Sequence, residues 1–305
     1  MSNELDFLVE DANSTDQETV RIGGTTYPFI QWISGDDKMD EESGIRYSGG
    51  FFAPKNSIDL TGVPGWTATY IKRNDKEGKP QKIEGFGSTK LMLAVINQRH
   101  RYEVLVKGAA MPEVFSHNQF EQAEARAAVL RQVDNQVSAK KKSQFLIVIK
   151  GIEQPVMLTV RGAMAKSFSG QNGLIQFFDR NFMSVVAAEL KKAGTNNLLP
   201  SRRFWMEIGI ATDAKGNPMF TPFGPSGRQT NMVPPAIYLP NPVTPSHIRD
   251  AHVGVDNRTK FDKLYTESLE WSKAWDNTKP AAVNQQLATT GPVVDPETAS
   301  ALADM

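Results

Sequence analysis

The sequence predicts an α+β fold, in which an antiparallel β barrel or strongly bent sheet of OB-like type is elaborated by helices and flanked by flexible termini. Short segments rich in β-branched and aromatic residues recur along the chain, and segments with helical periodicity interrupt them. Hydrophobic residues make up 40% of the 305 residues and charged residues 22%, which is typical of a soluble globular protein. A ferredoxin-like sheet fits the same order of elements.

Composition divides the chain into a domain and two tails. Residues 1–20 hold six acidic side chains and no basic one, which predicts a disordered acidic leader. Residues 21–276 carry the strand and helix patterns and predict a single α+β globular domain. Residues 277–305 are rich in Pro, Ala and Thr and predict a disordered tail.

The first part of the domain predicts strands. Alternation in residues 66–73 places Trp66, Tyr70 and Lys72 on one face of a strand. Residues 90–96 and 101–107 are predicted to be the two arms of a hairpin. Its joint would be Asn97-Gln98-Arg99-His100-Arg101, which concentrates positive charge between two apolar runs.

Helices and a second hairpin are predicted next. Apolar residues recur at helical spacing over residues 119–142, and Lys140-Lys141-Lys142 would complement the negative end of that helix dipole. Residues 145–149 and 156–160 are enriched in β-branched residues and predict a hairpin with its turn around Gly151. A second helix is predicted from Leu174 to Ala193.

The last part predicts one more strand pair and a helix. Residues 204–210 and 219–221 would pair around a turn at 213–217, followed by an extended loop over 222–246. A helix from Thr259 to Trp275 would present an apolar stripe. Its members are Phe261, Leu264, Tyr265 and Trp271.

Several classes of site lack their sequence signatures. The chain has no cysteine, no GxxxxGK[ST] or GxGxxG spacing, no GxSxG and no HExxH. His247 and His252 are five residues apart, not the four that one helical face requires for two metal ligands. We therefore predict no cofactor, no metal site and no catalytic residue. The absence of cysteine and of a long apolar run predicts a cytoplasmic protein without a membrane partner.

The strongest functional signal is clustered positive charge beside aromatic residues. Residues 66–107 hold nine Lys or Arg against four Asp or Glu, and residues 138–166 hold six against one. Single-stranded nucleic acids are bound by cations that follow the phosphates and by rings that stack on bases. The candidate binding residues are Trp66, Tyr70, Lys72, Arg73, Arg99, Arg101, Lys107, Lys150, Arg161, Arg203 and Trp205. Each cation taken singly is more typical of a solvated strand end, and only the set together favours nucleic-acid binding.

Trp205 is the most informative of the aromatic candidates. If Phe204, Met206 and Ile208 face the core, alternation turns Trp205 outward beside Arg203. An outward indole next to a cation suggests a base-stacking role. The alternative is an indole covered by the loop over residues 222–246.

The first third of the chain resembles uncharacterised proteins of cyanobacteria and of plasmids or phages. The resemblance is carried by Gln31-Trp32-Ile33-Ser34-Gly35-Asp36, Tyr47-Ser48-Gly49-Gly50-Phe51-Phe52, Pro64-Gly65-Trp66 and Leu93-Ala94-Val95-Ile96. It implies a mobile-element or replication-linked setting and no particular activity. The layout is also similar to single-strand-binding proteins, although the end of the chain, Ala-Leu-Ala-Asp-Met, lacks their acidic, aromatic-ended tip.

The leading expectation is a non-enzymatic protein that binds single-stranded nucleic acid, in the first instance DNA, with low sequence preference. Two alternatives stay open. One is a structural or assembly subunit of phage or plasmid origin, for which a homo-oligomer would be natural. The other is a metal-dependent nuclease with a dispersed acidic site.

Overall fold

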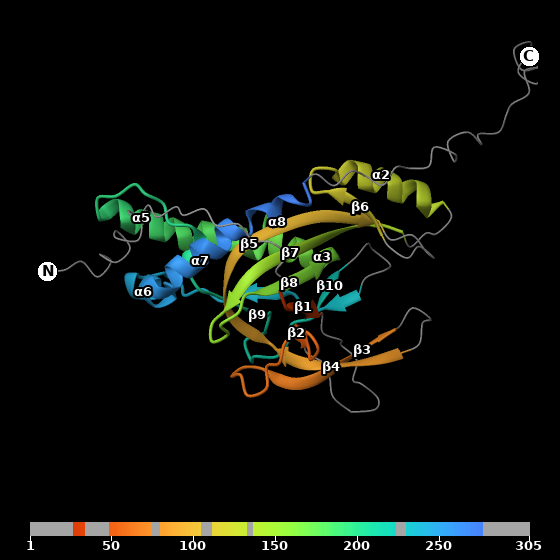
Figure 1. Ribbon diagram of the computed structural model, residues 1–305, viewed down its shortest axis with the longest axis horizontal. Coiled ribbons are helices and arrows are strands. Elements are labelled where there is room, and N and C mark those ends of the chain that lie inside the picture. Colours follow the sequence, from red (N-terminus) through yellow and green to blue (C-terminus); the bar gives the residue numbers. More distant parts are fainter. Residues whose placement is uncertain are drawn as a thin grey trace, which may run out of the picture.

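A long, bent β-sheet organises the protein. The computed structural model describes residues 27–33, 49–74, 80–104, 112–132, 137–223 and 230–276. Within them lie a ten-stranded sheet and a separate two-stranded one, β10–β11 (Figure 1). The strands are β1 Phe29–Ile33, β2 Gly50–Pro54, β3 Thr67–Asn74, β4 Pro80–Ser88, β5 Lys90–Val104, β6 Glu113–Ser116, β7 Ala139–Ile149, β8 Val156–Arg161, β9 Met206–Ile210, β10 Thr221–Phe223, β11 Thr230–Met232 and β12 Pro235–Ile237.

The sheet is open. Its strand order is β12-β9-β5-β7-β8-β1-β2-β4-β3, with β6 added beside β5. The pairs are antiparallel except β1 with β8, which run parallel. The α+β class and the strongly bent sheet are confirmed. The described part of the sheet does not close into a barrel, because β12 and β3 lie at its two ends, and the OB-like arrangement is not confirmed.

The helices lie around this sheet. They are α2 Phe120–Arg131, α3 Gly162–Ser169, α4 Leu174–Phe178, the π-helical turn η1 Asp179–Met183, α5 Ser184–Lys192, the 3₁₀ turn η2 Ser201–Arg203, α6 Pro245–Ala251, α7 Val255–Glu267 and α8 Leu269–Lys273. The helix predicted from Leu174 is confirmed as the run α4–η1–α5. The last predicted helix starts earlier, at Val255, and is broken at Ser268 into α7 and α8. None of the described helices combines the length and the apolar character needed to cross a bilayer.

The helix predicted over residues 119–142 is too long. α2 ends at Arg131, and Lys140, Lys141 and Lys142 lie in strand β7. The lysines therefore do not complement a helix dipole. Their side chains alternate between the two faces of the sheet, because successive residues of a strand point to opposite sides.

The hairpin predicted at residues 90–107 is wrong. Lys90–Val104 is one continuous strand, β5, which pairs with β7 over nearly its whole length. The register shifts between Val95 and Asn97, and a bulge of this kind bends a strand without ending it. The polar centre that suggested a turn lies inside the strand, where Arg99 and Arg101 face residues of β7.

The other strand predictions have mixed outcomes. The hairpin at 145–160 is confirmed as β7–β8. Strand β9 is present, but it pairs with β5 and β12 and not with residues 219–221. The segment 222–246 is not a single loop, because β11 and β12 lie within it and β10 and α6 overlap its two ends.

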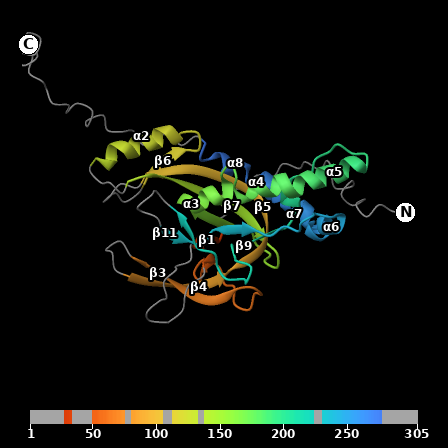
Figure 2. The ribbon, with the colours of Figure 1, turned by 180° about the vertical axis from the view of Figure 1, so that it is seen from behind.

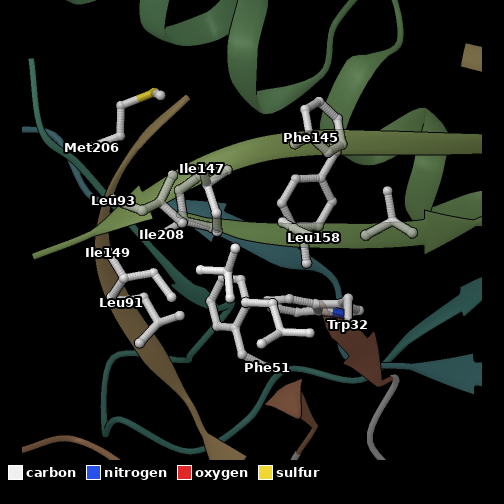
Figure 3. Packing of buried hydrophobic residues seen from close by; sticks show 14 of the residues in the cluster. Trp32, Phe51, Leu91, Leu93, Phe145, Ile147, Ile149, Leu158, Met206 and Ile208 are labelled. Atoms are coloured by element: carbon white, nitrogen blue, oxygen red, sulfur yellow. The ribbon is translucent and has the colours of Figure 1, made fainter. Parts of the chain in front are cut away.

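Apolar side chains cover both faces of the β5–β7–β8 region. The main core lies inside the bend of the sheet and includes Trp32, Phe51, Phe145 and Leu158 (Figure 3). Helices α3, α4 and α5 also pack on this core (Figure 2). On the opposite face, α7 covers a second cluster in which Phe261 is fully buried. The stripe predicted on the last helix is confirmed, since its other members pack against that cluster.

Candidate nucleic-acid interface

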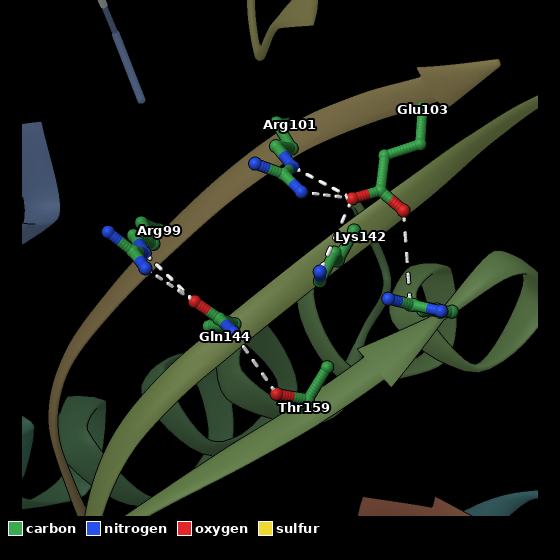
Figure 4. A network of polar contacts seen from close by, with 7 residues as sticks. Arg99, Arg101, Glu103, Lys142, Gln144 and Thr159 are labelled. Carbon is green, nitrogen blue, oxygen red and sulfur yellow. Dashed lines mark hydrogen bonds and ion pairs between the residues drawn. The ribbon is translucent and has the colours of Figure 1, made fainter. Parts of the chain in front are cut away.

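Three adjacent strands bring positive charge together on one face of the sheet. Arg101 of β5 lies opposite Lys142 of β7, and Lys142 lies opposite Arg161 of β8. Two residues back along β5, Arg99 lies on the same face, opposite Gln144. We call Arg99, Arg101, Lys142 and Arg161 the cationic face (Figure 4). Two of the strands, β7 and β8, are the confirmed hairpin.

A single buried carboxylate lies among these cations. Glu103 accepts hydrogen bonds from Arg101, with Nε at 2.9 Å from its Oε1, and its side chain is 5% exposed. The same Oε1 lies 3.3 Å from Nζ of Lys142, and Oε2 lies 3.9 Å from Nε of Arg161. Burial raises the pKa of Glu103, but the hydrogen bond from Arg101 and the charges of Lys142, Arg101 and Arg161 outweigh it and lower the pKa overall. One carboxylate cannot balance four cations, so the face keeps a positive excess.

Arg99 is held in a fixed orientation by a chain of amide and hydroxyl groups. Its Nε and Nη2 donate to Oε1 of Gln144 at 3.0 and 2.7 Å. Gln144 in turn donates from Nε2 to Oγ1 of Thr159 at 3.3 Å. Burial and the neighbouring Arg101 lower the pKa of Arg99 to about 10, so it remains charged at neutral pH.

Two indole rings from the end of the described chain cover the guanidinium groups. Cζ of Arg99 lies 4.5 Å from the ring centroid of Trp271 and 4.1 Å from that of Trp275. Cζ of Arg101 lies 4.4 Å from the Trp275 ring, and Nζ of Lys142 lies 5.8 Å from it. These are cation–π distances. Trp275 is only 8% exposed.

The two tryptophans expected to stack on bases are buried. Trp66 immediately precedes β3 and belongs to the main core. Trp205 does lie opposite the face of Phe204 and Met206, as alternation predicts, but α7 covers it. Its ring packs edge-on against Phe261 at 5.5 Å. The expectation of an outward indole is therefore wrong. Its alternative is not confirmed either, because α7, and none of the described residues of 222–246, belongs to the cluster that covers the ring.

Arg203 is also not available for a ligand. Its side chain is 7% exposed and pairs with Asp262 of α7. The same carboxylate lies 2.8 Å from Nε of Arg202, whose guanidinium stacks on Tyr265 at 4.2 Å. These contacts dock α7 on the sheet and give Arg203 a structural role.

The remaining candidates lie away from the cationic face or outside the described residues. Tyr70, Lys72 and Arg73 are on β3, at the end of the sheet separated from β8 by β1, β2 and β4. Tyr70 is half-buried, and Nζ of Lys82 lies 4.2 Å above its ring. Lys150 is exposed at the β7–β8 turn, the opposite end of that hairpin from Arg161. Lys107 lies outside the described residues.

The structure thus brings three of the eleven candidates, Arg99, Arg101 and Arg161, together on the cationic face. It also places there residues that the sequence did not predict. The sequence pattern places Lys142 at the end of the helix predicted over residues 119–142. It places Trp271 in the apolar stripe of the last predicted helix and Trp275 at the end of that helix. The signal that could have placed Lys142 was the lack of any Gly or Pro between Lys140 and the apolar run 145–149, so that nothing in the sequence separates the lysines from the confirmed hairpin. Nothing local in the sequence connects Trp275 with Arg99.

The histidines considered as metal ligands have other partners. Nδ1 of His247 lies 3.0 Å from the Thr244 hydroxyl in the capping box of α6, and His252 accepts from the backbone of Gly254 at 3.1 Å. No group of three or more His, Cys, Asp or Glu suited to a metal ion occurs within the described ranges. No protein-family model, curated protein or solved structure matches the chain.

Proposed function

We propose that this protein binds single-stranded nucleic acid, in the first instance DNA, with low sequence preference and without catalysis. The observation that carries this proposal is the cationic face, where Arg101, Lys142 and Arg161 contact one carboxylate and Arg99 lies on the same side of the sheet. A role in the replication or recombination of a mobile element belongs to the same proposal and rests on the sequence resemblance alone.

The chemistry of the face suits a polyanion. Phosphates of a strand are neutralised by Lys and Arg with release of counterions, so the affinity depends steeply on salt. Arg161 is 61% exposed at the open end of the face, and Lys140 is exposed one row further along β7, opposite Glu103. These two side chains are where an incoming phosphate would first meet the face.

Base contacts would come from guanidinium planes and not from the buried indoles of Trp66 and Trp205. Arginine planes stack on unpaired bases as aromatic rings do. Arg99 and Arg101 are both oriented by hydrogen bonds and both already stack on an aromatic ring. This replaces the stacking platform that the sequence predicted.

The test is a charge-matched pair of double variants titrated with a labelled oligonucleotide. Lys140→Gln/Arg161→Gln removes two charges at the cationic face, whereas Lys191→Gln/Lys215→Gln removes two exposed charges on α5 and in the turn at 213–217. Fluorescence anisotropy at several salt concentrations should show the first variant binding about tenfold more weakly, with a salt slope smaller by about 1.4. The second should bind as the wild type does. Absence of wild-type binding at low salt would overturn the proposal, as would equal losses in both variants.

An assembly subunit is the second candidate, and the observation that favours it is the sheet edge. Strand β3 is eight residues long and pairs only with β4 among the described strands. An unpaired edge of that length can template pairing with another chain. Light scattering of the protein free of nucleic acid tests this, since large assemblies would support it and a monodisperse monomer would exclude it. The nuclease alternative has no acidic cluster in the described part of the chain.

A further inference from the structure

The indole of Trp275 occupies the place on the cationic face that best fits a nucleic-acid base. It contacts Arg99 at 4.1 Å, Arg101 at 4.4 Å and Lys142 at 5.8 Å, so one flat aromatic ring is shared by three cations. An unpaired base has a similar size and also presents a π face.

We propose that Arg99 and Arg101 form a nucleobase subsite that Trp275 fills in the unbound protein, and that an unpaired base replaces the indole when a strand binds. This rests on the proposed function and specifies its ligand. A duplex keeps its bases stacked and paired, so only a single strand offers a free base face to the two guanidinium groups. The subsite would therefore give the preference for single strands.

The attachment of α8 is weak enough for such an exchange. The helix has five residues and none of them is buried. It follows Ser268, whose φ of −89° and ψ of 1° interrupt the helical path from α7. Short helices without buried side chains belong to the least stable parts of a fold.

Specific polar contacts hold the segment. Nδ2 of Asn97 donates to the hydroxyl and carbonyl oxygens of Ser268 at 3.0 and 3.3 Å. Nη1 of Arg99 donates to the carbonyl oxygen of Trp271 at 3.1 Å. Beyond Trp275, Asp276 and His117 meet at 3.0 Å through side chains that are about half exposed. The first contact lies at the junction with α7, so it would persist while α8 swings away.

By contrast, α7 is anchored and would stay in place. Phe261 is fully buried beneath it, and Asp262 pairs with the buried Arg203. The hinge implied by this contrast is Ser268, which is itself buried and fixed by Asn97. Opening would thus uncover Arg99 and Arg101 and withdraw Trp271 from the second hydrophobic cluster, while Phe261 and the α7 residues of that cluster stay packed.

The experiment compares an ordinary oligonucleotide with an abasic one of the same length. The abasic strand keeps the phosphates and lacks the bases, so it separates charge from stacking. Trp275→Ala and Trp275→Leu both remove the competing ring, and the leucine retains apolar volume in case the alanine variant folds poorly. Arg99→Lys keeps the charge but removes the planar face, and Arg249→Lys, at an exposed arginine of α6 outside the cationic face, is its control.

Both Trp275 variants should bind the ordinary strand about fivefold or more tightly than the wild type does, and the abasic strand as the wild type does. Arg99→Lys should weaken binding of the ordinary strand only, and Arg249→Lys should change binding of neither strand. Unchanged or weaker binding by the Trp275 variants would overturn the subsite, and so would an equal gain on both strands. If the subsite is overturned but the wild type still binds both strands, the proposed function stands. If neither the wild type nor any variant binds either strand, the subsite and the proposed function are both wrong.

Discussion

At the scale of single residues, Glu103 determines how much charge the face can present. Its carboxylate forms ion pairs with Arg101, Lys142 and Arg161. Burying several like charges together is costly unless a counter-charge with hydrogen bonds lies among them. Glu103 therefore permits the cluster to exist while leaving it positive.

The substitution Glu103→Gln tests this role. It leaves Arg101 and Lys142, with side chains 20% and 12% exposed, without their carboxylate, and should lower the free energy of unfolding by about 2–4 kcal/mol at pH 7. Because the folded pKa of Glu103 is lowered, its contribution is present above the usual pKa and is lost as the pH falls through the folded value. Urea unfolding should thus show the two proteins converging in strong acid. A constant gap at all pH values would contradict this account.

His100 also makes the free energy of unfolding depend on pH, in a range different from that of Glu103. Its Nδ1 lies 3.0 Å from the hydroxyl of the fully buried Ser143. Burial, with the charges of Lys141 and His117, holds its pKa at about 4, although Asp276 acts in the opposite direction. The unfolded chain takes up this proton near pH 6.5, before the folded chain does, so stability falls as the pH drops from about 6.5 to about 4.

The expected loss from His100 over that range is about 3 kcal/mol, since one pKa unit corresponds to about 1.4 kcal/mol. The variant His100→Gln should lose correspondingly less free energy of unfolding between the two pH values than the wild type does. Urea titrations at both pH values measure the difference. Parallel losses in wild type and His100→Gln would show that His100 does not carry the effect.

At the scale of elements, the sequence predicted what local patterns control. The β7–β8 hairpin and the helical run from Leu174 were predicted because continuous β-branched runs and apolar periodicity are local signals. Strand β5 was divided in two because Asn97 to Arg101 is polar, which is typical of a turn. The arginines of this segment remain in a strand because Gln144, Glu103 and the indoles of Trp271 and Trp275 are their partners. Trp275 lies far along the chain, so no local pattern could show this.

At the scale of elements, the docking of α7 on the sheet buries two of the candidate binding residues, Arg203 and Trp205. Asp262 pairs with Arg203, whose side chain is 7% exposed, and with Arg202. Asp262→Asn should lower the free energy of unfolding by about 3 kcal/mol, because it leaves a buried guanidinium without its counter-charge. Asp250→Asn is the matched control: its partner Arg249 lies at 3.6 Å with both side chains more than half exposed, so it should cost less than about 0.5 kcal/mol. Thermal or urea unfolding distinguishes them, and equal effects would argue against α7 as the anchor.

At the scale of the whole molecule, the bend of one sheet places a dry core and a charged face on opposite sides of the same strands. Phe145 and Leu158 point into the main core, while Lys142, Gln144 and Arg161 point away from it. Composition and strand pattern predicted the α+β class and the bend, because they require only many short strands and intervening helices. Closure depends on whether the two end strands meet, which is a long-range property that the pattern leaves open.

This arrangement predicts a gradient of stability across the molecule. Strand β7 is paired on both sides and covered on both faces, so its amides should exchange hydrogen most slowly. Residues 269–273 of α8 have no buried side chain, and β3 lies at the edge of the sheet, so both should exchange fastest. Mass spectrometry of exchanged peptides measures this directly.

A saturating single-stranded oligonucleotide should make the backbone amides of α8 exchange hydrogen faster. If a base takes the place of the Trp275 ring, α8 loses its contacts with Arg99 and its amides exchange faster, while α7 stays protected by Phe261 and by Asp262. An abasic strand of equal length supplies the phosphates without the bases and should leave α8 unchanged. Slower exchange at α8 on binding would instead mean that the helix closes over the strand, with the indole remaining on the guanidinium groups.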